Sequence, residues 1–103
     1  MPEFEFSHLD NAPVVKVSSG IRLHQLWESA DGPKALIVEM DAGAYLGVEV
    51  HEQGPEVAYV IEGVFDDGTV QHPAGSFIYC HKGSSHVPQS DVGCKVFFFY
   101  PQG

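Results

Sequence analysis

Apolar and polar residues alternate over short runs along this sequence, and no run keeps a helical period for three turns. Alternation with a period of two, over about four to eight residues, is typical of β-strands with one buried face. The pattern predicts strands at 14–17, 21–27, 34–40, 56–62, 75–80 and 94–100. The chain is therefore expected to be all-β.

Short clusters of glycine, proline and polar residues separate these runs, and such clusters are typical of turns. They lie at 31–33, 41–43, 66–68, 73–75 and 82–84. A spacing of roughly 8–12 residues between turns indicates a β-sandwich or a closed barrel. Because there is no linker-like segment, residues 1–103 are expected to form one domain, with 1–12 as a candidate N-terminal arm.

The composition favours a globular protein, because 44% of the residues are hydrophobic and 12% are aromatic. The net charge of −9 argues against nucleic acid and anionic membranes as partners, since both present negative charge. No apolar run approaches the ~20 residues of a membrane span, and the N-terminus lacks a secretion signal, so a cytoplasmic location is expected. Cys80 and Cys94 are then expected to be free thiols.

Three ligand-type side chains lie close together in the stretch GVEVHEQGPEVAYVIEG, at 47–63: Glu49, His51 and Glu56. Side chains alternate along a strand, so Glu49 and His51 are expected on the same side. The segment 52–55, EQGP, has the composition of a turn. If the chain reverses there, Glu56 returns opposite His51, and facing Cβ atoms are then about 4.5–5.5 Å apart.

Two carboxylates and an imidazole on an interior face are costly to bury unless they are paired or bind a metal. Their nitrogen and oxygen donors suit Fe, Mn, Ni or Zn, and an imidazole–carboxylate site with open positions suits redox iron chemistry. Without a metal, one of two close carboxylates would take up a proton at a raised pKa. Ala58 and Val60, which share the strand face of Glu56, leave room for a bound group. The sequence therefore predicts a divalent transition metal here.

Two longer stretches carry a family resemblance: HEQGPEVAYVIEG at 51–63 and GSFIYCHKGSSH at 75–86. Together they resemble the two motifs of the cupin superfamily. A further string, GSSHVPQSDVGC at 83–94, is similar to the ChrR-like branch of small single-domain cupins. The resemblance covers about residues 40–100, and it implies a double-stranded β-helix, which is the jelly-roll barrel of cupins.

The resemblance implies a metal set of Glu49, His51, Glu56 and His86. Glu49 stands where the family has a first histidine, and it is either a fourth ligand or a group that detaches and acts as a general base. Two acids make this set harder than three histidines and one acid, which shifts the expected metal toward Mn or Fe and away from Cu. They also leave a divalent site near neutral, which weighs slightly against an anionic substrate.

Several other positions have simpler interpretations. His81 replaces a family proline and is either a proton shuttle at the pocket mouth or a plain loop substitution, while Ser90 replaces an asparagine. Glu62 is expected to be a surface acid, and the segment FFFY at 97–100 is expected to be core, with one face able to wall the pocket. Three histidines without ligand spacing are expected to be structural or exposed: His8, His24 and His72.

Two functions from different classes are compatible with this site. The first is a metal-dependent enzyme acting on a small oxygenated substrate, either dioxygenase-like or a Lewis-acid isomerase or lyase. The resemblance supports it, because some ChrR-like members cleave β-diketones oxidatively. The second is a non-catalytic cupin that senses a small molecule or a metal and acts through a separate partner, and a third is a pocket that has lost its metal. By analogy with small cupins, a homodimer is expected.

Overall fold

The computed structural model describes residues 3–51 and 53–103, and strands dominate them. A single 3-10 turn, η1 (Leu9–Asn11), comes first. The strands that follow are β1 (Val14–Ser18), β2 (Ile21–Glu28), β3 (Lys34–Met40), β4 (Ala44–Tyr45), β5 (Glu49–Val50), β6 (Glu56–Asp66), β7 (Gln71–Pro73), β8 (Phe77–Cys80), β9 (Ser85–His86), β10 (Gln89–Ser90) and β11 (Cys94–Tyr100). The prediction of an all-β chain is confirmed.

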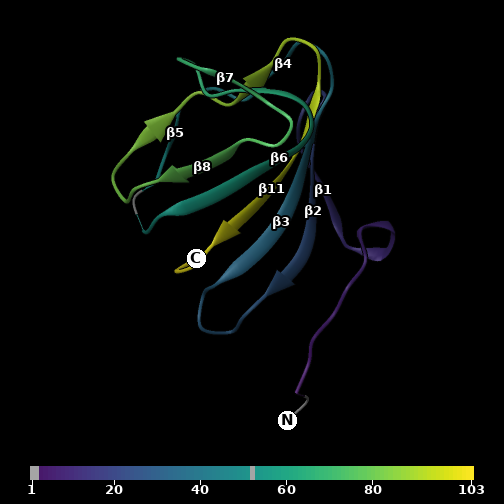
Figure 1. The fold of residues 1–103 in the computed structure, drawn as a ribbon. Coiled ribbons are helices and arrows are strands. Elements are labelled where there is room, and N and C mark those ends of the chain that lie inside the picture. The colour runs from purple at the N-terminus through teal and green to yellow at the C-terminus, as the bar shows by residue number, and fades with distance from the viewer. Residues whose placement is uncertain (1–2, 52) are drawn as a thin grey trace.

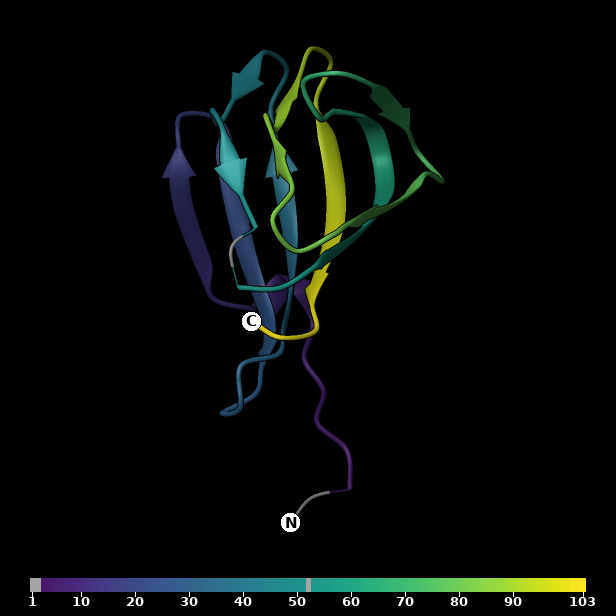
Figure 2. The same cartoon turned by 90° about the vertical axis from the view of Figure 1, so that its left-hand side faces the viewer.

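Antiparallel pairing joins the strands into one large curled sheet and one small sheet (Figure 1). The large sheet has the order β1-β2-β3-β11-β6-β10-β4, and both β7 and β8 also pair with β6. The small sheet consists of β5 and β9, and it faces β2, β3 and β11 across the interior (Figures 1 and 2). The molecule is thus a β-shell whose two walls can hold side chains between them.

The concave side of the large sheet holds the apolar core. Strand β11 shows how the sequence produces it, because Val96 and Phe98 are buried while Phe97 and Phe99 lie on the outer face. Burying one such side chain stabilises the fold by roughly 1.5–3 kcal/mol. The apolar side chains at most 1% exposed, outside alanine, are Ile21, Val60, Phe65 and Val96.

All six predicted strands are present, most of them within one or two residues at each end. The largest difference is β6, which continues to Asp66 because its last residues pair with β7 in a hairpin. The two- and three-residue strands β4, β7, β9 and β10 have no predicted counterpart, since runs this short show no period. Strand β5 lies where the alternation of Glu49 and His51 assumes a strand.

Residues 3–8 extend away from the body of the molecule, as both views show (Figures 1 and 2). Phe4 and Phe6 are 77% and 93% exposed, and the Ser7 hydroxyl donates to the carbonyl of Leu26. The arm at 1–12 and the single domain at 1–103 stay predictions, and the first two residues lie outside the described ranges. Within those ranges, no helix is long and apolar enough to cross a membrane.

Among the described glycines, Gly63, within β6, is the one where an added Cβ would lie closest to another segment. Its φ is 72°, and a Cβ there would lie 2.0 Å from the carbonyl oxygen of Gly93, just before β11. Gly75 has a similar φ of 93°, yet a Cβ there would meet nothing within 4 Å. Both glycines adopt a positive φ that favours glycine, but only Gly63 is also fixed by packing.

We expect Gly63→Ala to lower the free energy of unfolding by more than about 3 kcal/mol, because it adds a backbone clash to a strained φ. Gly75→Ala is the matched control, and it should lower that free energy by only about 1–2 kcal/mol. Urea unfolding followed by tryptophan fluorescence measures both variants. Equal losses would contradict the close approach of β6 to Gly93.

Candidate metal centre

Four side chains from separate segments meet in the interior: His51, Glu56, Cys80 and His86. Their donor atoms all lie within 4.8 Å of one another. First-row metals bind such donors at about 2.0–2.3 Å, so donors on opposite sides of one ion are up to about 4.6 Å apart. The four donor atoms are thus close enough that side-chain movements could bring them around a single ion.

Two β-ladders bring these side chains together. In the small sheet, Glu49 of β5 is the cross-strand partner of His86 in β9. In the large sheet, Glu56 at the start of β6 pairs with Cys80 at the end of β8. The expected pairing of Glu56 opposite His51 is therefore wrong, because β5 and β6 enter different sheets instead of forming a hairpin.

His51 directly follows β5, and its backbone fixes the ring in place. Its N–H donates to the carbonyl of Ser84 at 2.9 Å, and its carbonyl accepts from the N–H of Gly83 at 2.7 Å. These bonds hold His51 against the segment that leads into β9. Its ring meets that of His86 edge to face, with 4.7 Å between the centroids.

Glu56 contacts each of the other three members of the group. Its Oε2 lies 3.7 Å from Nδ1 of His51, and its Oε1 lies 3.8 Å from Nε2 of His86. The thiol of Cys80 donates a long hydrogen bond of 3.9 Å to Oε1. The side chain of Glu56 is 0% exposed, so every one of these contacts is shielded from water.

Glu49 lies at the mouth of this group. Its Oε1 is 3.0 Å from Nε2 of His86, which is the ring nitrogen that also faces Glu56. Its side chain is 39% exposed. Glu49 therefore contacts the group through His86, and it is the acid that solvent or a bound molecule can reach.

Two buried polar atoms show whether a cation fits. Oε2 of Glu56 and Nε2 of His51 are shielded from water and have no hydrogen-bond partner. An unsatisfied buried polar group costs about 1–3 kcal/mol, and more when it is charged. A cation among these donors would satisfy the carboxylate, and the mixed N, O and S set suits Fe, Mn or Zn. The residues present thus fit the predicted divalent metal.

Burial and neighbouring charges push the pKa values of the two central groups upward. Burial raises the pKa of Glu56 to about 7, although the Tyr100 hydroxyl and His86 act in the opposite direction. Burial alone would lower the pKa of His86, but its contacts with Cys80 and Glu49 and the charge of Glu56 raise it to about 10. The metal-free group therefore holds protons that a metal would displace.

The pKa values of the surrounding groups also shift, for reasons that follow from their contacts. The hydrogen bond with His86 holds the pKa of Glu49 below its usual range, against the effect of burial. Burial and the charge of His86 lower the pKa of His51. Burial and the charge of Glu56 raise the pKa of the Tyr100 hydroxyl, which stays protonated. The mouth thus has an ionised acid beside a neutral hydroxyl.

Cys80 is the member of the group that the sequence motifs do not predict. Both cysteines are free of disulfides, as expected, but the sequence pattern indicates Cys80 only as a free thiol. The signal was present in the alternation of 77–80, where Phe77 and Tyr79 are exposed and Ile78 and Cys80 are not. A residue facing inward beside Ile78 could have been identified as a candidate ligand.

The remaining predicted positions lie outside the group. His81 is exposed, and its ring meets that of Tyr79 at 4.7 Å. Ser90 is structural, because its hydroxyl donates to the carbonyl of Val64 and accepts from the N–H of Gly93. Glu62 is exposed, as predicted. The other histidines are exposed or pair with acids outside the group: His8 with Asp10, His24 with Glu39 and His72 with Asp67.

The family model described as the ChrR Cupin-like domain matches residues 3–102. This is nearly the whole chain, so the protein belongs to the ChrR-like cupins, as its motifs indicate. A comparison with curated proteins finds no match.

Solved cupin structures share the fold. An RmlC-like cupin from Shewanella frigidimarina superposes with a TM-score of 0.82 at 21% identity, over 98% of this chain and 93% of that one. A protein from Methylibium petroleiphilum, whose name gives acetylacetone dioxygenase as a proposed activity, has a TM-score of 0.84 at 18% identity, over 98% and 78%. The anti-sigma factor ChrR of Rhodobacter sphaeroides, solved with SigE, has a TM-score of 0.76 at 19% identity, over 90% of this chain and 50% of that one. The predicted jelly-roll cupin fold is confirmed.

The pKa shifts predict how the stability of the metal-free protein depends on pH. Folded Glu56 keeps its proton up to about pH 7 and folded His86 up to about pH 10, whereas their ordinary values are 4.5 and 6.5. These two groups therefore hold more protons in the folded state than in the unfolded chain across this window, and the lowered pKa of His51 offsets part of the difference. Stability should fall as the pH rises from about 4.5 to about 10.

The variant Glu56→Gln keeps the shape of the side chain and removes its charge, so it tests the contribution of Glu56 to this pH dependence. We expect it to stabilise the metal-free protein by about 1–3 kcal/mol at pH 8 and by little at pH 5. Urea unfolding in the presence of EDTA at the two pH values measures the difference, and Glu62→Gln, at an exposed acid, is the control. If Glu56→Gln made the protein less stable than the wild type at both pH values, the assigned cost of ionised, buried Glu56 would be contradicted.

Proposed function

We propose that this protein is a metal-dependent cupin enzyme that acts on a small oxygenated organic molecule. The observation that carries the proposal is the fully buried carboxylate of Glu56, one of whose oxygens has no hydrogen-bond donor. Two imidazoles and a thiol lie around it. A divalent cation is the group that offsets the cost of burying such a charge.

In this proposal His51, Glu56 and His86 hold the metal, and Glu49 or Cys80 completes the set. Two imidazoles with carboxylates favour iron or manganese. Such a metal supplies Lewis acidity, and iron also supplies dioxygen chemistry. Membership of the ChrR-like cupins supports the proposal.

Two groups at the mouth are proposed to act on the substrate. Glu49 is ionised and half-exposed, so it can accept a proton from a bound diketone, enol or hydroxy acid. Tyr100 stays protonated, so its hydroxyl can donate to a substrate oxygen. Both line a cavity of about 370 Å³ together with His51 and Lys34, which gives the substrate room beside the metal.

Protein purified without chelator should contain close to one equivalent of Fe, Mn or Zn, measured by elemental analysis. His51→Ala and His86→Ala should lose that metal, while His81→Ala, at an exposed histidine, should keep it. Free metal at about 100 times its dissociation constant should stabilise the wild type by about 2.7 kcal/mol and leave the first two variants unchanged. Undiminished metal content in His51→Ala would contradict the assignment.

Cobalt substitution identifies the additional ligand. If Cys80 binds, the Co(II) protein should show a thiolate-to-metal charge-transfer band that Cys80→Ser removes and Glu49→Gln retains. If Glu49 binds instead, the band should be absent, and Glu49→Gln should weaken metal binding.

Catalysis is tested by dioxygen uptake and product analysis with the iron- and manganese-loaded protein and a panel of β-diketones, enols and hydroxy acids. If Glu49 is the general base, Glu49→Gln should lower kcat by about 100-fold or more at unchanged metal content. Metal-loaded protein that turns over none of these compounds would contradict the enzymatic proposal.

A second candidate is a cupin that senses a metal or a small molecule and acts through a partner. The observation that favours it is the match to the family model named for ChrR, whose solved structure contains a sigma factor. Metal binding without turnover, together with a partner that co-purifies only with the metal-loaded form, would support this candidate. Under either function we propose a cytoplasmic homodimer.

A further inference from the structure

Two cavities adjoin at Lys34, one beside the metal centre and one over β2 and β3. The cavity at the mouth, of about 370 Å³, is lined by Glu49, His51, Tyr100 and Lys34, among others. A second cavity of about 340 Å³, here called the apolar groove, lies over β2 and β3 and shares Lys34 with the first. A smaller apolar gap touches both, through Tyr100 and Leu36. The spaces are therefore neighbours with common walls.

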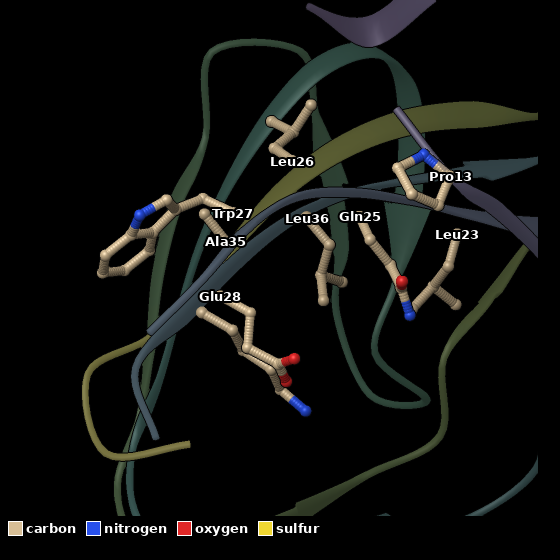
Figure 3. A pocket seen from close by; sticks show the side chains of 9 residues that line it. Pro13, Leu23, Gln25, Leu26, Trp27, Glu28, Ala35 and Leu36 are labelled. Atoms are coloured by element: carbon tan, nitrogen blue, oxygen red, sulfur yellow. The ribbon is translucent and has the colours of Figure 1, made fainter. Parts of the chain in front are cut away.

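The apolar groove has an apolar floor with few polar groups. Figure 3 shows Leu23, Gln25 and Leu36 projecting on one side of the two strands, with Glu28 beyond them. The pairing of β2 with β3 shifts register between Gln25 and Trp27. Such a bulge locally bends its strand, which separates the side chains on either side of it. The groove thus suits a hydrocarbon chain.

Lys34 stands where the groove meets the mouth cavity. It is the cationic residue among the described residues that line these two cavities. Its Nζ lies over the Tyr100 ring, 5.1 Å from the centroid, and none of the ion pairs found among the described residues includes it. Exposed cation–π contacts are worth only about 0.5–1 kcal/mol, so this charge remains available to an anion.

Two acids near Lys34, Glu28 and Glu49, could compete with a bound carboxylate for its charge. Glu28 is its cross-strand partner, but the two do not form an ion pair. Glu49 is already bonded to His86 at 3.0 Å. An incoming carboxylate therefore meets a lysine that forms no ion pair with either acid, although its charge also acts on Glu49. The net charge of −9 otherwise repels anions.

We propose that the substrate or ligand of this protein is a carboxylate with an apolar chain of about four to eight carbons. The carboxylate pairs with Lys34, the chain lies in the apolar groove, and the rest of the molecule extends toward Glu49 and His51. Lys34 supplies the positive charge that a near-neutral metal centre lacks, which reverses the expectation against an anionic substrate. The inference deepens the proposed function and rests on it only for the end of the molecule that reaches the metal.

Straight-chain alkanoates are the probes: acetate, butanoate, hexanoate and octanoate, with hexanol and octanol as uncharged counterparts. Calorimetric titration at pH 7.5 into protein treated with EDTA measures affinity without any metal. We expect affinity to rise roughly threefold for each added methylene up to hexanoate. The alkanols should bind at least threefold more weakly than the alkanoates of equal length.

Three variants separate the charge of Lys34 from unspecific effects. Lys34→Gln should weaken hexanoate binding about two- to fivefold, which is the range for a partly exposed charged contact. Lys16→Gln, at an exposed lysine of β1, should leave it unchanged. Glu28→Gln should strengthen it, because the competing acid is gone. Equal affinities for wild type and Lys34→Gln, or no dependence on chain length, would overturn the proposal.

The alkanoate titrations and the metal analysis test the carboxylate site and the metal centre separately. If alkanoates bind as expected and the protein holds no metal, the proposed function fails and the carboxylate site stands. If the protein holds metal but none of the alkanoates binds below 10 mM, the carboxylate site fails and the metal centre stands. Lys34→Gln should keep the metal content of the wild type, which shows that its loss of binding is local.

Discussion

One buried carboxylate constrains the rest of this structure. No described acid is more buried than Glu56, which has no contact with water and leaves one oxygen without a hydrogen-bond donor. An ion in such a place is destabilising unless charge or protons compensate it. Here His51, Cys80 and His86 surround it, and its pKa is raised to about 7. The unpaired oxygen and the surrounding donor atoms are consistent with the divalent cation proposed above.

The β-shell makes that arrangement possible by joining segments that are distant in the chain. The small sheet places His86 beside Glu49, and the large sheet places Cys80 beside Glu56. The two sheets face each other across the interior, and the side chains of His51, Glu56, Cys80 and His86 therefore converge. Because the positions are fixed by backbone pairing, the donors are held near one another before any ion binds. Preorganisation of this kind lowers the cost of binding.

The two ends of the interior differ in chemistry. At the metal centre the donors are polar and the acid Glu49 is ionised, while the groove over β2 and β3 is walled mainly by apolar side chains. Lys34 lies between them, held over the Tyr100 ring. The proposed ligand has three parts that match this order: a reactive end at the metal centre, a negative charge at Lys34 and an apolar chain in the groove.

Alternation and motif spacing are local properties of the chain, so the all-β class, six of the strands and three residues of the central group could be predicted from the sequence. Which donors meet depends on how distant segments pair. The tertiary structure separated β5 from β6 into two sheets, added Cys80 and placed Glu49 at the mouth. The other very short strands and the position of Lys34 also emerged only there. Burial and cross-strand partners depend on long-range pairing, which no local pattern encodes.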